Sequence, residues 1–94
     1  MATSRTAADS KGRNALHAPL KRLRDEILDL YLDWREQAAA VADAYASWAG
    51  APVGEEGQCF AAYTSALDRE QAAARSYADV LANAERLSRR WKAP

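Results

Sequence analysis

The fold is decided by the stretch YASWAGAPVGEE at residues 45–56. Gly50 follows the last regularly spaced apolar residue, and Pro52 comes two positions later. Glycine favours the left-handed backbone conformation just past a helix end, and proline cannot continue helical hydrogen bonding. The stretch therefore predicts that a first helix ends near residue 49 and that Gly50 has a positive φ.

Two carboxylates, Glu55 and Glu56, follow this turn directly. Acidic side chains are favoured at the positive end of a helix dipole, so a second helix is expected to begin near residue 55. A loop of about residues 50–54 is short, and short loops between helices make the two neighbours antiparallel.

Upstream of the turn, apolar residues recur every seven positions at Leu20, Ile27, Trp34, Val41 and Trp48. This spacing predicts one helix with a continuous apolar stripe. Proline suits the first helical turn, so Pro19 marks the expected start of a helix over about 19–49. Residues 1–17 are polar and basic without periodicity, which predicts a flexible, disordered arm.

Downstream of the turn, a second apolar stripe predicts a helix over about 55–91. The 23 alanines, four glycines and three prolines of this 94-residue chain suit helices, and no strand pattern is present. The sequence therefore predicts an all-α protein in which residues 18–92 form an antiparallel two-helix hairpin.

The stripes carry more aromatic residues than one helix–helix seam can cover. Each of the three tryptophans and four tyrosines can bury roughly 150–250 Å². The surplus predicts pairing, with a second copy or another helical protein, into a four-helix bundle. The expected interaction seam is Leu20, Ile27, Trp34, Val41, Tyr45, Trp48, Phe60, Tyr63, Leu67, Tyr77, Leu81 and Trp91.

Charge is separated along the predicted hairpin although the chain is neutral overall. Residues 1–24 hold six basic and one acidic residue, residues 25–70 two and ten, and residues 71–94 five and two. An antiparallel dimer would set the acidic turn half against the basic ends, burying more than about 1,200 Å² of mainly apolar surface. A simple preference of basic residues for helix C-termini explains part of the same pattern.

Glu70 interrupts an apolar row between Tyr63 and Tyr77, and Gln37 interrupts the facing one. A buried carboxylate needs hydrogen-bond donors, which Gln37, the Trp34 indole or a tyrosine could supply. The pair predicts a polar layer that fixes helix register, or Glu70 is simply an edge residue that reaches water. A catalytic or metal-binding carboxylate is the alternative, but no Glu-x-x-His motif accompanies it.

The other reactive side chains indicate no catalysis. Cys59 is expected to be a small, buried residue near the start of the second helix, with an interchain disulfide or a redox role as the alternatives. His17, the single histidine, is expected on the surface. We therefore expect no enzyme, no cofactor and no metal site.

The predicted termini bring basic residues together at Arg22, Arg24, Arg86, Arg89 and Arg90, beside Trp91. This basic end is either a solvated surface or, as an alternative function, a site for nucleic acid or an anionic membrane. The overall charge of zero does not favour nucleic acid. Without a signal-like apolar segment or a run long enough to span a bilayer, the sequence predicts a cytoplasmic protein.

Trp48-Ala49-Gly50 at the turn of a hairpin just under 100 residues long resembles the Trp-x-Gly family of type VII secretion. Ten arginines against three lysines and the many alanines suit an actinobacterial source, where that family occurs. The resemblance implies a non-enzymatic hairpin, pairing as a four-helix bundle with Trp and Gly at the turn, and a secretion-type substrate.

Overall fold

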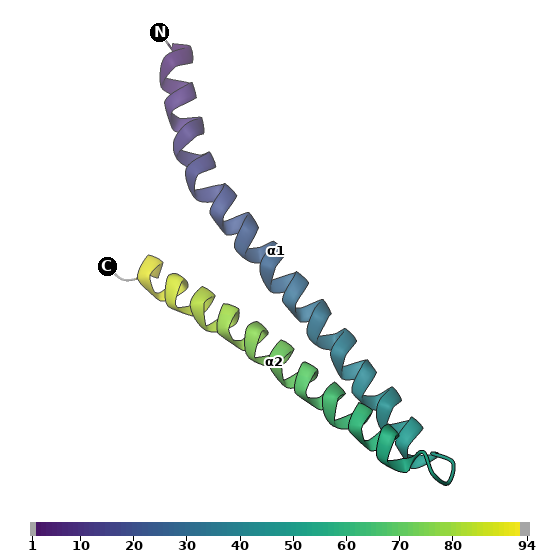
Figure 1. The fold of residues 1–94 in the computed structure, drawn as a ribbon. Helices are drawn as coiled ribbons and strands as arrows, with labels where there is room; N and C mark the ends of the chain where they lie inside the picture. Colours follow the sequence, from purple (N-terminus) through teal and green to yellow (C-terminus); the bar gives the residue numbers. More distant parts are fainter. Residues whose placement is uncertain (1, 93–94) are drawn as a thin grey trace.

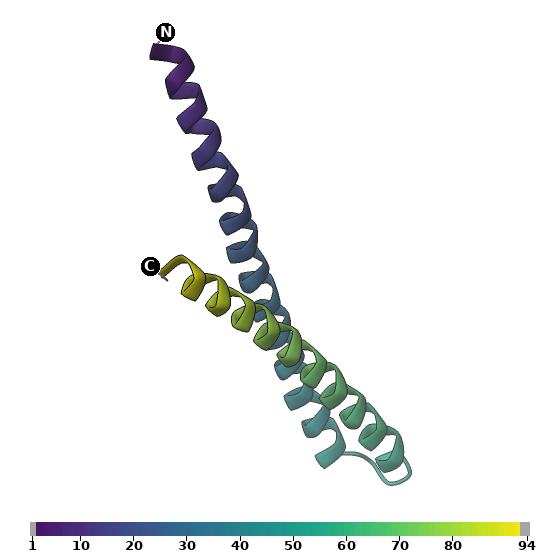
Figure 2. The same cartoon turned by 90° about the vertical axis from the view of Figure 1, so that its left-hand side faces the viewer.

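The protein is an all-α hairpin of two long helices. The computed structural model describes the backbone of residues 2–92 and the side chains of residues 17–91. Helix α1 spans Ala2–Ala49 and helix α2 spans Glu56–Lys92, and the described residues contain no strand. The helices lie side by side near the turn and diverge toward their free ends (Figures 1 and 2), giving an elongated molecule of 80 × 29 × 13 Å.

Helix α1 begins well before Pro19, where we predicted its first turn, and Pro19 lies inside the helix. Residues 2–18 include five alanines, and alanine, arginine and lysine all favour helix. One proline removes a single helical hydrogen bond, so strong formers on either side can continue the helix past it. The N-terminal part of α1 extends beyond the end of α2 (Figure 1), and the mobility predicted for it stays a prediction.

The turn corrects one prediction: φ is positive at Gly54, where it is 95°, and not at Gly50. The Gly50 N–H donates to the Ala46 carbonyl at 3.1 Å, so α-helical bonding continues one residue past α1 without a left-handed cap. The chain reverses later, where the Glu55 N–H donates to the Pro52 carbonyl at 3.0 Å. In this turn of residues 52–55 the third residue is Gly54, and a type II turn requires a positive φ at that position.

The buried side chains of the hairpin are small. Ala66, Ala73 and Val80 lie at seven-residue spacing along the side of α2 that faces α1, and no larger side chain is buried among the described residues. Small residues on one helix allow the partner helix to approach closely. The larger side chains of the seam, such as Trp34 and Val41, are half-buried, so the core is one thin layer.

Candidate interaction surface

Aromatic side chains form a cluster beside the turn. The Trp48 ring stacks on Tyr63 with centroids 5.5 Å apart and an interplanar angle of 14°, and it meets Phe60 at 5.0 Å. Tyr45 packs edge-on against both Tyr63 and Trp48, at 5.6 and 6.1 Å. Rings from both helices thus join α1 to α2 immediately after the chain reverses.

A second aromatic cluster lies near the middle of the hairpin. The Trp34 ring stacks on Tyr77 with centroids 5.8 Å apart and an interplanar angle of 17°. Tyr31 contacts the same tyrosine at 5.6 Å and Trp34 at 6.2 Å. The two clusters repeat one arrangement, in which a tryptophan of α1 stacks on a tyrosine of α2 and a tyrosine of α1 flanks the pair.

A hydrogen bond made by the tryptophan of the second cluster also joins the two helices. The Trp34 Nε1–H donates to Glu70 Oε1 at 2.8 Å, in a partly buried position, so one donor predicted for Glu70 is confirmed. Gln37 instead donates to Asp33 of its own helix, at 3.4 Å. The observed polar contact between the helices is therefore Trp34 with Glu70, and the donation predicted from Gln37 to Glu70 is replaced by the bond within α1.

One face of the hairpin leaves large apolar side chains exposed. On α1, Tyr31 and Tyr45 contact Tyr77 and Tyr63 of α2 but remain exposed. On α2, further apolar residues at seven-residue spacing are also exposed. We define the apolar face as Tyr31, Tyr45, Phe60, Leu67 and Leu81, all of which are exposed, Tyr45 by 53 % and Phe60 by 46 %.

The opposite face is different in composition. By helical spacing it carries small and polar residues, namely Asp33, Ala40, Ser47, Ala62, Arg69 and Ser76. The row of exposed aromatic and leucine side chains that spans both helices therefore lies on one of these two faces. A single such face is the pattern of a two-helix unit that packs against one further layer.

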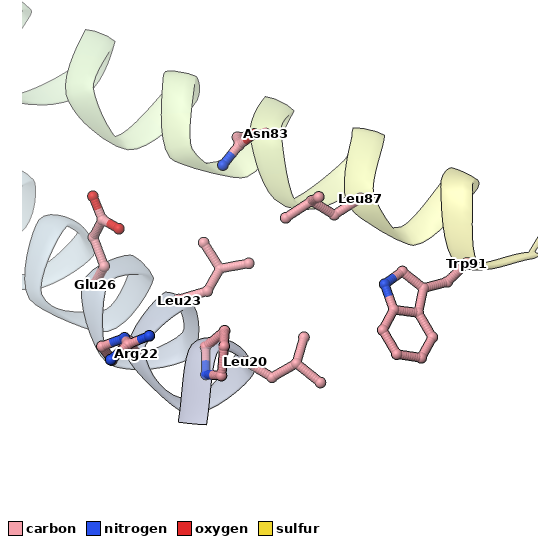
Figure 3. Close-up of a pocket in the computed structure, with 8 residues that line it drawn as sticks. Leu20, Arg22, Leu23, Glu26, Asn83, Leu87 and Trp91 are labelled. Atoms are coloured by element: carbon pink, nitrogen blue, oxygen red, sulfur yellow. The ribbon is translucent and has the colours of Figure 1, made fainter. Parts of the chain in front are cut away.

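The diverging helices leave an open groove of about 440 Å³ at their free ends. Leu20 and Leu23 of α1 face Leu87 of α2 across this gap, and Trp91 lies at its outer end (Figure 3). Leu20 is 47 % exposed and Trp91 62 %. Leu20 and Trp91 were predicted on the seam, but the groove was not predicted, because the periodicity of a sequence does not show that two helices diverge.

The two ends of the hairpin carry opposite charge. At the open end, residues 17–27 and 81–91 hold six basic and three acidic residues, a net charge of +3. At the turn end, residues 41–67 hold three acidic residues and no basic one. The predicted basic residues are all exposed at the open end, and Arg89 pairs with Glu85 at 2.8 Å on the surface of α2.

The structure also places the two remaining candidate residues of the sequence. Cys59 is free and half-buried in the first turns of α2, and His17 is exposed. No group of three His, Cys, Asp or Glu side chains that could hold a metal is found among the described residues. None of the described helices has a stretch both long and apolar enough to cross a bilayer.

Comparisons with models of protein families, with curated proteins and with solved structures found no match to this chain. The resemblance to the Trp-x-Gly family therefore stays a prediction. In the structure, Trp48 lies in the last turn of α1 and Gly50 comes directly after that helix.

Proposed function

We propose that this chain is a non-catalytic helical interaction module, which pairs with itself or with another helical protein through the apolar face. The observation that carries the proposal is the row of exposed Tyr, Phe and Leu side chains along one side of the hairpin. Single exposed apolar residues are ordinary on protein surfaces. A contiguous row of them on one face is typical of an interaction surface.

The thin core supports the same proposal. Only two alanines and a valine are buried among the described residues, while the large aromatic groups remain half-buried or exposed. Apolar burial contributes about 25 cal/mol per Å², so a two-helix seam of small residues gives limited stability. A further helical layer on the apolar face would bury the aromatic clusters and complete a bundle.

The proposal is tested by replacing two exposed residues of the apolar face, Phe60→Ser and Leu67→Ser, in the full chain. A helical partner that co-purifies from the native host, or a second copy seen by sedimentation, should be lost from this variant. Ala62→Ser and Ala72→Ser form the matched control, since they add serines to exposed positions of α2 outside the apolar face. Complexes that survive the first variant, or no complex at all, would contradict the proposal.

The basic open end favours a second candidate, binding to nucleic acid or an anionic membrane. Exposed arginines from both helices and the exposed Trp91 ring gather there. Such binding would depend steeply on salt, because phosphate neutralisation releases counterions. Titration of the chain with a DNA duplex and with anionic vesicles at two salt concentrations tests it.

A type VII secretion-type substrate is the candidate that the resemblance implies. The hairpin with Trp48 and Gly50 at its turn supports it. Appearance of the chain in the culture medium of the native host, dependent on a functional secretion system, is the observation that would test it.

A further inference from the structure

We propose that a cleft at the turn of the hairpin binds an organic cation, namely an ammonium group that carries methyl groups. The cleft has a volume of about 390 Å³ and is lined by Tyr45, Trp48, Ala49, Ala51 and Glu56. We call it the turn cleft, and it lies at the end of the hairpin opposite the free ends of both helices (Figure 1). This site goes beyond the proposed function, since it needs neither a second copy nor a helical partner.

The aromatic lining of the turn cleft is the first argument. The Tyr45 and Trp48 rings have centroids 6.1 Å apart and an interplanar angle of 78°, so they line the cleft in two nearly perpendicular orientations. Tyr45 is 53 % exposed, and Trp48 is half-buried. The face of an aromatic ring attracts a cation within about 6 Å of its centroid, and tryptophan does so most strongly.

The carboxylate of Glu56 is the second argument. Glu56 is the first residue of α2, is exposed and lines the same cleft as the two rings. Among the described residues the only ion pair is the one between Arg89 and Glu85, so Glu56 has no cationic partner there. Aromatic rings alone accept any apolar group, but a carboxylate beside them favours a positively charged one.

The distance to the basic residues of the chain is the third argument. Along the helices, Arg35 and Arg69 are the nearest, each 13 residues from Trp48 or Glu56. That separation is about 20 Å along a helix, more than twice the screening length of about 8 Å at physiological ionic strength. The partial charges of the two helix ends at the turn have opposite signs and cancel. The turn end therefore stays acidic and is open to an external cation.

The lining also indicates which kind of cation fits. A metal ion needs several oxygen ligands, and the turn cleft offers one carboxylate side chain. Methyl groups on an ammonium add apolar surface that can contact the ring faces and the two alanines of the lining. A volume of about 390 Å³ is within the range of small-ligand sites. Such a group occurs in free small molecules and in methylated lysine side chains of proteins.

Titration of the full chain, followed by nuclear magnetic resonance, tests the proposal. Choline is the probe for a free ligand, and an acetylated, amidated trimethyllysine peptide is the probe for a protein side chain. Each should shift the Trp48 indole N–H signal saturably, with a Kd of the order of millimolar, while the Trp34 and Trp91 signals stay in place. Tighter binding of the peptide would indicate a protein side chain, and tighter binding of choline a free ligand. An equal shift with 3,3-dimethylbutan-1-ol, the uncharged analogue of choline, would overturn the proposal.

Two substitutions with matched controls test the lining. Glu56→Gln should weaken choline binding by about threefold to tenfold, whereas Glu55→Gln, which removes the same charge outside the turn cleft, should weaken it by less than about twofold. Tyr45→Leu should weaken it by a similar three- to tenfold factor. Tyr31→Leu, in the other aromatic cluster, should leave it unchanged. Equal effects within either pair would overturn the proposal, with far-ultraviolet circular dichroism checking that all four variants fold.

Discussion

Trp34 joins the helices in two ways near the middle of the hairpin. Its ring stacks on Tyr77, and its indole N–H donates to the Glu70 carboxylate at 2.8 Å. A half-buried carboxylate has lost part of its water, so this donor replaces solvent at one oxygen. Trp48 makes the same kind of stack, on Tyr63, at the turn.

The hydrogen bond can be separated from the stack by one substitution at each tryptophan. Trp34→Phe keeps an aromatic ring but removes the donor, so it should destabilise the chain by about 1 kcal/mol more than Trp48→Phe does. Urea unfolding followed by circular dichroism measures the difference. If Trp34→Phe and Trp48→Phe lower the free energy of unfolding equally, or if the effects of Trp34→Phe and Glu70→Ala on it are fully additive, the hydrogen bond contributes nothing.

The two glycines of the turn should respond in opposite ways to alanine. Gly54→Ala places a side chain at φ 95° and should cost about 1 kcal/mol. Gly50→Ala should be neutral or stabilising by a few tenths of a kcal/mol, because its φ is not positive and an added Cβ would meet Ala46 O at an ordinary 3.6 Å. Thermal melts of the two variants check this, and a more damaging Gly50→Ala would contradict the turn described.

The sequence predicted the location of the turn but not its left-handed residue. Gly50 and Gly54 lie on either side of Pro52, and each is a reasonable helix stop. Which one takes a positive φ depends on whether helical bonding ends before or after Gly50. The hydrogen bond from the Gly50 N–H to the Ala46 carbonyl shows that helical bonding ends after Gly50, and the local composition does not predict this bond.

The helices differ in how completely they are partnered. Helix α1 has 48 residues and α2 has 37, so the N-terminal part of α1 continues past the end of α2 (Figure 1). Pro19 lies where this unpartnered part begins. Because its ring nitrogen carries no proton, the helical carbonyl four residues earlier, at Ala15, has no donor there.

Pro19→Ala should therefore act on one element rather than on the whole fold. Restoring a helical hydrogen bond should slow amide exchange upstream of residue 19, while the exchange of α2 amides stays unchanged. Hydrogen exchange read by nuclear magnetic resonance measures both regions in one experiment. Unchanged exchange upstream would mean that the proline does not limit this part of α1.

The short loop predicted the antiparallel order of the two helices, and the spacing of apolar residues predicted the helices themselves. This spacing was less informative about which row of α2 faces α1. The rows containing Ala66 and Leu67 are adjacent, and the small residue takes the buried position while Leu67 stays exposed. Hydrophobicity alone favours leucine for the seam, but helix separation is set by how closely the backbones approach.

For the whole molecule, the separation of charge should influence the direction of pairing more than its strength. If two copies pack through the apolar face, raising sodium chloride to roughly 0.5 M should weaken the dimer by less than about tenfold. Sedimentation at both salt concentrations measures this. A loss of several orders of magnitude would show that charge, and not apolar burial, supplies most of the affinity.

The candidate surface was only partly accessible from the sequence. The surplus of aromatic residues predicted that another chain buries part of their surface. Trp34 was among the hydrogen-bond donors predicted for Glu70. The groove between Leu20 and Leu87 was not, since it arises from the angle between helices. That angle comes from packing along the entire seam and has no local sequence signal.

The arrangement of the hairpin also determines how it responds to mechanical force. Contacts between α1 and α2 lie in a single line, and the free ends of both helices are on the same side of the turn (Figure 1). A pull on the two ends loads this line at Leu20 and Leu87 first, so contacts are peeled one after another instead of sheared together. The chain should open at low force like a zipper, and the aromatic cluster around Trp48 and Tyr63 should be the last to separate.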